Sequence, residues 1–333
     1  MNVLFRCDGS VEVGMGHVVR CLALADFLKK NRKYSIYFAM RKSAIGINTV
    51  KESYPVFESN ERFFNYEDWL SGCIKLANAN ILIMDMRDGL TRVELNRVKE
   101  KTQIKVITID DPEDKRLEAD LAFYPPVPQL KKTKWQGFNG ELRIGWEYVI
   151  LRKEFSQSFP KPNNDIANIF ICMGGTDATN MTEYVINTLK DINKKFKAVV
   201  TVGSGYPYVQ ELRNTLNSLG YRYELHQNPD NLAAIMSKAD FAIISFGQIA
   251  YELAALHIPA IYLCISDDHF ESSKLFMNEG IGFSLGVFSK VKKYKLVGKV
   301  ISNISNKDIV KDMSVRAANL KISDLNEILI NIG

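Results

Sequence analysis

Short apolar runs alternate with longer amphipathic stretches along most of this chain. The runs at residues 81–85 and 241–245 are too short for ordinary helices and are predicted to be buried strands. The amphipathic stretch at residues 18–30 is predicted to be a helix. Strands that alternate with helices form βαβ units, in which the strands run parallel. The chain is therefore predicted to be an α/β protein with parallel sheets.

The alternation occurs in both halves of the 333-residue chain. Predicted strands occupy residues 3–6, 35–39, 81–85, 105–110 and 121–124, then 168–172, 197–202, 221–226, 241–245 and 260–264. Predicted helices occupy residues 18–30, 92–101, 179–189, 208–219, 232–237, 249–256 and 271–279. Residues 125–150 look irregular. Residues 159–165 are rich in Pro and Asn and are predicted to be a linker.

These patterns predict two Rossmann-like domains, residues 1–158 and 159–333, that face each other across a cleft. In such sheets a ligand lies at the carboxyl ends of the strands. We therefore look for functional residues in the loops that follow the predicted strands.

Composition and charge narrow the class of protein. Hydrophobic residues make up 46% and charged residues 24%, as in ordinary globular proteins. Apolar runs such as residues 258–265 fall far short of the roughly 20 residues of a membrane helix, and we expect neither stable membrane insertion nor a secretory signal. The five cysteines form no CxxC pair, which favours a cytoplasmic protein with reduced thiols. A net charge of +5 without a binding motif does not predict a nucleic-acid partner.

A glycine-containing loop follows the first predicted strand and leads into a helix. It includes Gly14 and Gly16 and ends at His17. Such a loop lets a ligand approach the backbone, and the helix N-terminus offers N–H groups to an anion. Val19 stands where a dinucleotide fingerprint needs Gly or Ala, so that motif is not present, and neither is a P-loop.

His17 lies where this loop becomes the helix. The positive end of the helix dipole favours a neutral imidazole, which is the form that a general base needs. A histidine that only caps the helix or packs in the loop would explain the position as well. The residues alone leave both interpretations open.

The second half contains a similar loop after residues 168–172. Gly174, Gly175 and Thr176 form a turn whose amides can wrap a phosphate. Asp177 or Thr179 is predicted to cap the helix that follows. Gly-Gly turns are common, so this loop by itself is a weak signal.

Another loop follows the predicted strand at residues 241–245. Ser245, Gly247 and Gln248 lie near a helix N-terminus, a position that suits a diphosphate. Glu252 follows about one turn into the helix, where a carboxylate can accept hydrogen bonds from both hydroxyls of a ribose. The alternative for Glu252 is an ordinary exposed helix carboxylate.

A further loop contains Asp267, Asp268 and His269. Two carboxylates and an imidazole at a strand end can bind a divalent metal ion. Asp267 or Asp268 as a helix N-cap explains the same residues, so the sequence does not predict a metal site here.

Together these motifs resemble a known family. The segments Arg6-x-Asp8-x-Ser10 and Gly14-x-Gly16-His17 with the following Arg20, and the Cys-Met-Gly-Gly-Thr-Asp run at residues 172–177, are similar to those of the UDP-sugar hydrolases of the pseudaminic acid pathway and their spore-coat relatives. Residues 245–252 resemble the nucleotide-binding helix of that family. The resemblance extends to about residue 285. The family shares the GT-B architecture with the glycosyltransferase that makes lipid II.

The resemblance implies a function and a set of site residues. His17 would be the general base that activates a water, and UDP would leave with inversion at the anomeric carbon. No metal or other cofactor is implied. The implied nucleotide site consists of Gly174, Gly175, Thr176, Ser245, Phe246, Gly247, Gln248 and Glu252. The implied sugar site consists of Asp8, Gly14, Gly16, Asp85, Arg87, Asp268 and His269.

The chain departs from the family at places that should lie near the sugar. Asp85-Met86-Arg87 stands where the family usually has Asp-His-Tyr, and Asp268-His269 stands where it has Asn-Gln. Arg87 is a fixed cation that suits a carboxylate or phosphate, which leaves a sugar other than the family's usual one open. Asp85 is expected to bind sugar or to be structural, and Asp110 and Asp111 are placed near the cleft by position.

Several functions remain open at this stage. A hydrolase of a UDP-linked amino-deoxy sugar is the leading interpretation, with the UDP-sugar as its partner. A glycosyltransferase on the same fold would pass the sugar to an acceptor, and a non-catalytic protein would only bind the nucleotide sugar. Fold alone does not separate these functions. A nicotinamide dehydrogenase is disfavoured because the glycine fingerprint is missing.

Overall fold

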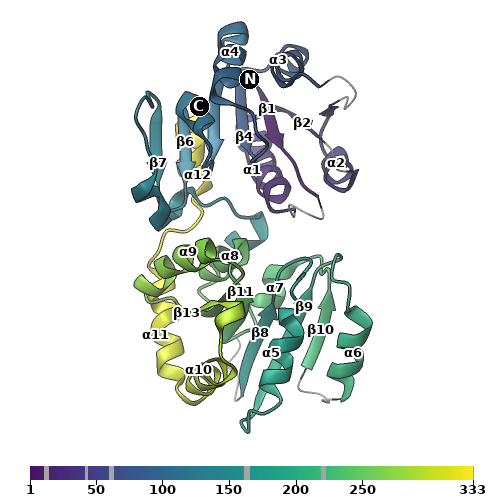
Figure 1. Ribbon diagram of the computed structural model, residues 1–333, viewed down its shortest axis with the longest axis vertical. Coiled ribbons are helices and arrows are strands. Elements are labelled where there is room, and N and C mark those ends of the chain that lie inside the picture. The colour runs from purple at the N-terminus through teal and green to yellow at the C-terminus, as the bar shows by residue number, and fades with distance from the viewer. Residues whose placement is uncertain (11–14, 42–43, 60–63, 161–165, 219–222, 333) are drawn as a thin grey trace. The chain divides into compact units, whose positions relative to one another are not determined.

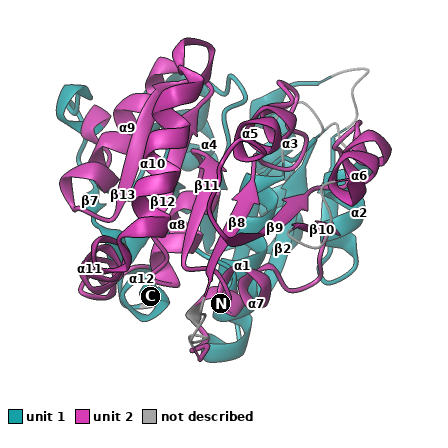
Figure 2. Cartoon of the chain, turned by 90° about the horizontal axis from the view of Figure 1, so that it is seen from below, with its two compact units in different colours: residues 1–126, 130–152, 323–333 teal, residues 127–129, 153–322 magenta. Residues whose placement is uncertain are grey.

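The computed structural model describes residues 1–10, 15–41, 44–59, 64–160, 166–218 and 223–332. The chain forms two compact units (Figure 2). Unit 1 comprises residues 1–126, 130–152 and 323–333, and unit 2 comprises residues 127–129 and 153–322. The predicted division falls between residues 158 and 159, whereas the main stretch of unit 2 begins at residue 153 and ends at residue 322. The predicted linker at residues 159–165 lies largely outside the described residues.

Unit 1 contains a parallel sheet, drawn in the upper part of Figure 1. Its strand order among the described residues is β3-β2-β1-β4-β5-β6-β7. The strands are β1 (Asn2–Cys7), β2 (Ser35–Met40), β3 (Val56–Glu58), β4 (Ile81–Asp85), β5 (Lys105–Ile109), β6 (Leu121–Tyr124) and β7 (Glu141–Ile144). The order reverses direction between β1 and β4, which places a topological switch point there.

Helices cover this sheet. They are α1 (Gly16–Arg32), α2 (Ala44–Lys51), α3 (Tyr66–Ala77), α4 (Arg92–Thr102) and α12 (Leu325–Ile332). Helix α1 buries Val18, Cys21, Leu24 and Leu28, which share one face because they recur every three or four residues. The C-terminal helix α12 adds Ile328 and Ile332 to the same core cluster. This burial is the reason that residues 323–333 belong to unit 1.

Unit 2 repeats the arrangement with the order β10-β9-β8-β11-β12-β13 among its described residues. The strands are β8 (Ala167–Cys172), β9 (Phe196–Val202), β10 (Tyr223–Gln227), β11 (Phe241–Ser245), β12 (Ala260–Cys264) and β13 (Gly282–Val287). The helices are α5 (Met181–Leu189), α6 (Val209–Ser218), α7 (Leu232–Met236), α8 (Gln248–Ala255), α9 (Asp267–Asn278), α10 (Lys293–Ser305) and α11 (Lys307–Ala318). Here the switch point lies between β8 and β11.

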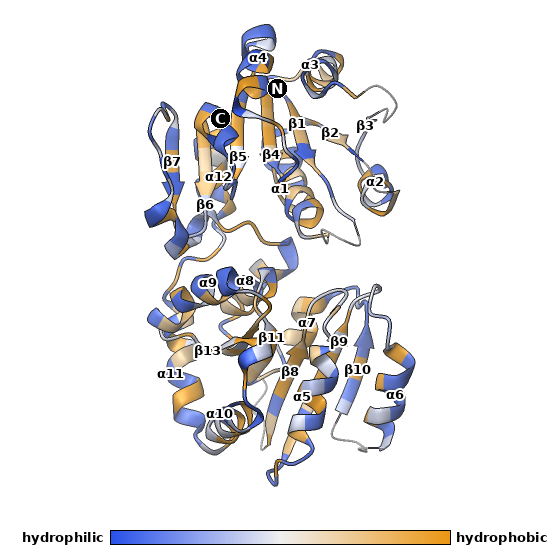
Figure 3. Ribbon diagram, viewed as in Figure 1, coloured by the Kyte–Doolittle hydropathy of each residue, from blue (hydrophilic) through white to orange (hydrophobic). Residues whose placement is uncertain are grey.

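The central strands of both sheets are mainly hydrophobic, whereas helices such as α5 and α6 carry both kinds of residue (Figure 3). Every residue of β4, β11 and β12 is buried. Parallel strands covered on both faces by helices have this composition. The prediction of parallel sheets in both halves is therefore confirmed.

The structure also corrects parts of the sequence prediction. The segment 125–150, expected to be irregular, contains β7, which pairs in parallel with β6. Short 3₁₀ turns at Asp114–Glu118, Pro128–Lys132, Trp146–Tyr148, Lys153–Ser156 and Phe288–Lys290 were not predicted. All five cysteines are buried free thiols, as expected. Within the described ranges, no helix has the length and apolar content to cross a membrane.

Candidate active site

The switch point of unit 1 brings two loops together. Strands β1 and β4 are neighbours, and Cys7 at the end of β1 is in register with Asp85 at the end of β4. Helix α1 begins after the β1 loop, and its first turn contains Gly16 and His17. The sequence separates His17 and Asp85 by 68 residues, and the sheet brings them to the same edge.

His17, Asp85 and Arg20 form a hydrogen-bonded cluster. The Nδ1 atom of His17 lies 2.7 Å from Oδ1 of Asp85. Arg20, one turn further along α1, donates from Nε to Oδ2 at 2.7 Å and from Nη2 to Oδ1 at 2.6 Å. Asp85 is completely buried, whereas the His17 side chain is 26% exposed. The cluster thus fixes the Nδ1 side of the imidazole.

Asp85 stays ionised in this cluster. Burial by itself would raise the pKa of the carboxyl. The charge of Arg20 and the hydrogen bonds from His17 and Arg20 outweigh burial, so the pKa of Asp85 lies below its ordinary value. An anionic Asp85 can only accept a hydrogen bond, so His17 carries a hydrogen on Nδ1; in a neutral imidazole the lone pair then lies on Nε2.

A second carboxylate faces the same arginine. Oδ2 of Asp110, directly after β5, lies 3.7 Å from Nη1 of Arg20. Burial and the negative charge of Asp85 raise the pKa of Asp110, although Arg20, Arg87 and His17 act in the opposite direction. Asp110 has been placed near the site by position alone, and the structure ties it to the arginine of the cluster.

A neighbouring network holds Asp8, which follows β1 and was predicted to bind the sugar. The buried Arg6 guanidinium donates to Asp8 Oδ2 at 2.6 Å and to Asp88 Oδ2 at 3.0 Å. Tyr66 of α3 contacts both Arg6 and Asp88 through its hydroxyl. The other oxygen of Asp8 accepts from the backbone N–H of Arg41 at 2.6 Å. Asp8 is therefore fixed through both of its oxygens.

The other residues of unit 1 that were predicted to bind the sugar differ in their surroundings. Arg87 is exposed, and it has no ion-pair partner within the described ranges. Gly16 is exposed, and a β-carbon added there would meet nothing within 4 Å, so the space above it is open. Gly14 lies outside the described residues.

In unit 2, the glycine turn follows β8 at the switch point. Gly174 has a φ of 94°, a left-handed conformation that favours glycine. β-carbons added to Gly174 or Gly175 would meet open space. A β-carbon on Gly203, after β9, would lie 2.3 Å from the carbonyl oxygen of Gly175, so the turn rests against that loop. A β-carbon on Gly205 would lie 3.0 Å from Cγ2 of Thr176, so the Thr176 side chain packs against the same loop.

Asp177 ends this turn, and its side chain accepts hydrogen bonds at the start of α5, although the N-cap residue is Asn180 and neither Asp177 nor Thr179. Its Oδ1 accepts from the N–H of Met181 and its Oδ2 from that of Thr182, each at 2.8 Å. Burial raises the pKa of Asp177, and these amide hydrogen bonds oppose the shift. The capped amides at the start of α5 are thus already occupied by a carboxylate of the chain itself.

Helix α8 follows β11 on the other side of the switch point. Ser245 and Phe246 are buried, and the Phe246 ring packs edge-on against Tyr262 and Phe276. Gly247 is the N-cap of α8, and as a glycine it offers no side chain that could cap the helix. Glu252 is only 6% exposed, so the interpretation as an ordinary exposed carboxylate is wrong.

Asp268 and His269 lie in the first turn of α9 rather than at its cap. The N-cap is Ser266, whose hydroxyl accepts from the N–H of His269 at 3.2 Å. The prediction of Asp267 or Asp268 as the cap is therefore wrong. Gln129 donates to Oδ1 of Asp268 at 3.0 Å, and the His269 ring lies 6.2 Å from that of Phe246. Among the described residues, no group of three or more His, Cys, Asp or Glu side chains is placed to hold a metal ion.

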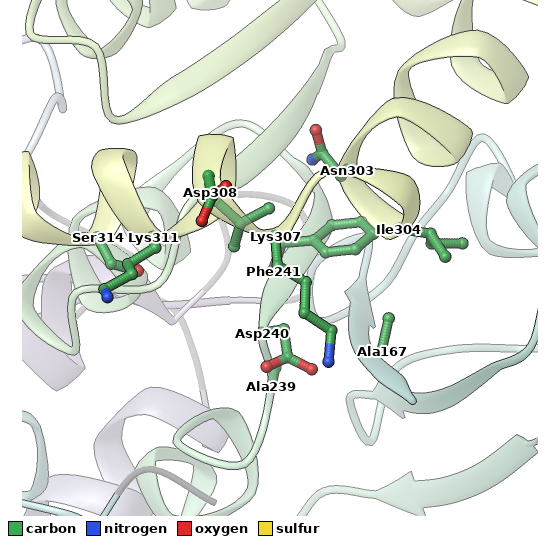
Figure 4. A pocket seen from close by; sticks show the side chains of 11 residues that line it. Ala167, Ala239, Asp240, Phe241, Asn303, Ile304, Lys307, Asp308, Lys311 and Ser314 are labelled. Atoms are coloured by element: carbon green, nitrogen blue, oxygen red, sulfur yellow. The ribbon is translucent and has the colours of Figure 1, made fainter. Parts of the chain in front are cut away.

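A cavity of about 240 Å³ opens at the opposite edge of the unit 2 sheet (Figure 4). It is lined at the amino ends of β8 and β11 by Ala167 and Phe241, and by Asn303, Lys307 and Lys311 of α10 and α11. The cavity contains none of the predicted nucleotide-site residues, because these follow the carboxyl ends of the strands.

The sequence interpretation did not assign roles to Arg6, Arg20 or Asp110. Arg6 and Arg20 were part of the motif that carries the resemblance, and the signal for Asp110 was its place after a strand. Hydrogen bonds between residues 65 positions apart could not be inferred from one sequence. The structure brings Gly16, His17 and Asp85 together at one edge of unit 1. It brings Gly174, Gly175, Thr176 and residues 245–252 to one switch point of unit 2.

Comparison with known proteins identifies relatives over most of the chain. No protein-family model matches it. An uncharacterized protein of Methanocaldococcus jannaschii is 30% identical over 277 residues, which are 79% of this chain and 55% of that protein. The chain thus spans about half of that relative.

Two further relatives carry descriptive names. The UDP-2,4-diacetamido-2,4,6-trideoxy-beta-L-altropyranose hydrolase of Campylobacter jejuni is 28% identical over 77% of this chain and 89% of its own length. The spore coat polysaccharide biosynthesis protein SpsG of Bacillus subtilis is 23% identical over 89% of this chain and 87% of its own length. These relatives confirm the resemblance drawn from the motifs.

Solved structures confirm the GT-B fold. MurG of Acinetobacter baumannii matches with a TM-score of 0.72 at 13% identity, covering 100% of this chain and 99% of that one. The spinosyn rhamnosyltransferase SpnG matches with a TM-score of 0.68 at 13% identity, and the match covers both chains completely. At these identities the likeness concerns the fold alone.

Proposed function

We propose that this chain, a GT-B-fold homologue of the hydrolase and the spore-coat protein just described, hydrolyses a UDP-linked amino-deoxy sugar. The products are UDP and the free sugar, and the reaction serves the synthesis of a surface polysaccharide. The observation that carries the proposal is the hydrogen bond between Nδ1 of His17 and the buried carboxylate of Asp85. It leaves the other ring nitrogen available as a base.

His17 is the proposed general base. Because Asp85 accepts a hydrogen bond from Nδ1 of His17, the lone pair of a neutral imidazole lies on Nε2. This atom can take a proton from water. The imidazolium that forms is stabilised by the Asp85 anion, which Arg20 holds through both oxygens. Asp85, expected to bind sugar or to be structural, acts in this proposal as the residue that positions His17.

The proposed reaction is a single displacement. The water oxygen forms a bond to the anomeric carbon while its proton passes to Nε2 of His17. The bond between the anomeric carbon and the UDP oxygen breaks, and its electron pair leaves with the diphosphate. Attack opposite the leaving group inverts the anomeric configuration.

Unit 2 is proposed to hold UDP. The amides of the turn at Gly174 and Gly175 and those at the start of α8 can bind the diphosphate. Such donors stabilise the negative charge that develops on the leaving group, so the proposal assigns no metal to this step. Glu252 is the proposed ribose ligand. Ser245, Phe246, Gly247, Gln248 and Thr176 complete the proposed nucleotide site.

An NMR time course tests the proposal. The protein is mixed with UDP-2,4-diacetamido-2,4,6-trideoxy-β-L-altropyranose, without any acceptor and with or without EDTA. The expected result is release of UDP and of the free sugar with inverted anomeric configuration, at the same rate in both buffers. Binding of UDP without release from this compound contradicts hydrolysis of that sugar. A rate that falls in EDTA and returns with Mg²⁺ contradicts the metal-free step.

A glycosyltransferase is the second candidate, because one of the solved structures that share this fold is a rhamnosyltransferase. In that case His17 would take the proton of an acceptor hydroxyl instead of a water. UDP release that occurs only after an acceptor is added, with the sugar found on the acceptor, would favour the transferase. The acceptor-free time course therefore separates the two functions. A protein that binds the nucleotide sugar without any turnover is the third alternative.

A further inference from the structure

Asp110 has a backbone conformation that aspartate adopts rarely. Its φ is 51°, in the left-handed region, where a side chain other than Gly costs conformational energy. Its N–H donates to the carbonyl oxygen of Phe123 at 2.8 Å, so β6 holds it in place directly after β5. Aspartate tolerates this region better than most residues other than glycine, so the conformation fixes the place of Asp110 beside the candidate active site and the side-chain contacts must show its role.

The Asp110 side chain turns toward the His17 cluster and remains partly open. Its Oδ2 lies 3.7 Å from Nη1 of Arg20, and the side chain is 32% exposed. Asp85 on the other side of the same guanidinium is completely buried. Arg20 thus bridges two carboxylates, of which one positions His17 and the other is accessible from outside.

Asp110 has hydrogen-bonding capacity that the chain does not use. The 3.7 Å separation from Arg20 is an ion pair but too long for a hydrogen bond. Within the described ranges, neither oxygen of Asp110 accepts a hydrogen bond. Arg87 lies near enough for its charge to act on Asp110. A carboxylate held this way is an acceptor for an O–H or N–H group of a bound molecule.

We infer that Asp110 is a substrate-binding residue that recognises an O–H or amide N–H group of the sugar next to the reacting carbon. The inference rests on the proposed function because it assumes that unit 1 holds the sugar of a sugar nucleotide. The sugar class that fits carries a hydrogen-bond donor, a hydroxyl or an acetamido group, at that position. Arg20 couples this contact to the base, since the same guanidinium orients Asp85.

The closing experiment measures what the sugar adds to binding. The His17→Asn protein, in which we expect turnover to be slower by at least about a hundredfold, is titrated with UDP and with UDP-2,4-diacetamido-2,4,6-trideoxy-β-L-altropyranose. The ratio of the two Kd values gives the sugar contribution. It is then measured for Asp110→Gly, Asp110→Ala and Asp110→Asn in the same background. Asp110→Gly keeps the left-handed backbone without strain, so its fold is not at risk.

A matched control is available in Gln103, an exposed residue with a φ of 55° at the end of α4. The Gln103→Gly change relieves the same kind of backbone conformation away from the cluster. We expect both glycine variants to melt at or above the temperature of the parent protein, and the sugar contribution of Gln103→Gly to remain that of the parent.

In Asp110→Gly and Asp110→Ala, the affinity for UDP should stay unchanged. The sugar contribution should fall by about tenfold to a hundredfold, the usual effect of removing a charged hydrogen-bond partner. Asp110→Asn should lose less, because its amide oxygen still accepts. An unchanged ratio in Asp110→Gly overturns the inference, and so does a parent protein that binds this sugar nucleotide no more tightly than UDP.

The two proposals fail separately. If the sugar contribution depends on Asp110 while the unaltered protein releases no UDP, the substrate contact stands and the proposed hydrolysis does not. If UDP is released and the Asp110 variants bind the sugar nucleotide like the parent, hydrolysis stands and the contact does not.

Discussion

Arg20 holds both oxygens of Asp85, with Nε 2.7 Å from Oδ2 and Nη2 2.6 Å from Oδ1. The two residues come from α1 and from the end of β4, so this pair ties the first helix of unit 1 to its central strand. Because Asp85 also contacts His17, a change in Arg20 should alter the orientation of the imidazole. This relation can be tested without touching the proposed base.

Arg20→Lys should lower kcat by about tenfold or more while the affinity for UDP remains unchanged. A lysine has no planar fork and cannot hold both oxygens of Asp85 together. The measurement is steady-state UDP release alongside calorimetric titration with UDP. Arg32→Lys, at the exposed end of the same helix, is the control and should match the parent. A kcat equal to that of the parent in Arg20→Lys would show that the clamp does not orient His17.

His17→Asn should reduce kcat by about a hundredfold to ten-thousandfold, the usual contribution of a general base. Binding of UDP should change little, because His17 belongs to unit 1 and the proposed nucleotide site to unit 2. His257→Asn serves as the control, since asparagine suits its left-handed backbone with a φ of 59°. Parallel loss of turnover and UDP affinity in His17→Asn would make His17 a structural residue.

Glu252→Ala should weaken UDP binding by about tenfold to a hundredfold, since a ribose hydroxyl would lose a charged acceptor. The Glu252 side chain is buried in α8, so Glu252→Gln is measured alongside Glu252→Ala as a variant that preserves the packing. Calorimetric titration with UDP, and with ribose 5-phosphate as a ligand that lacks the base, measures the effect. The exposed Glu211→Ala in α6 is the control. Unchanged UDP affinity in both Glu252 variants would remove this residue from the ribose.

Asp111 should make the stability of the protein depend on pH between about 4 and 6. The carboxyl is 1% exposed, and burial raises its pKa to about 6 against the opposing charge of Lys115. The folded protein therefore binds this proton more tightly than the unfolded chain. The stabilisation that comes from protonated Asp111 is complete below pH about 4, which is the pKa of Asp in an unfolded chain. It is lost as the pH rises through about 6.

A shift of about two pKa units corresponds to about 3 kcal/mol. The free energy of unfolding of the parent, minus that of Asp111→Asn, should therefore grow by about this amount between pH 8 and pH 4. Urea denaturation at several pH values measures both proteins. All other groups titrate in both proteins, so parallel pH profiles would contradict a raised pKa of Asp111.

Ile328→Ala should destabilise unit 1 by about 2–5 kcal/mol, as large-to-small changes in a core do. Ile328 is completely buried within the core of unit 1, although it lies near the C-terminus of the sequence. The exposed Ile330→Ala, two residues away, is the control. Hydrogen exchange should show the loss in β1 and α1. Loss of protection confined to unit 2 would contradict the assignment of α12 to unit 1.

The sequence was most informative where one interaction dominates. Buried central strands such as β4 and β11 were predicted with their observed bounds, because a continuous apolar run has few other uses in a globular protein. The short strand β7 has exposed and half-buried residues, so its pattern is weak. Ser266 rather than an aspartate caps α9, a choice between neighbouring side chains that depends on local backbone geometry.

The site was predictable only in part, for the same kind of reason. Glycines and a histidine after strands can be recognised from their order along the chain. Which carboxylate meets that histidine depends on strand order, since β4 and not β2 places an aspartate beside it. The left-handed conformation of Asp110 has no sequence signal, because aspartate occurs far more often in other conformations.

The return of α12 to unit 1 has a consequence for synthesis on the ribosome. Residues 153–322 of unit 2 form one uninterrupted stretch, whereas the core of unit 1 needs Ile328 and Ile332 from the far end of the chain. During translation, unit 2 can complete its core while unit 1 still lacks its last helix. A nascent chain stalled before residue 323 would therefore hold a finished second half and an unfinished first half.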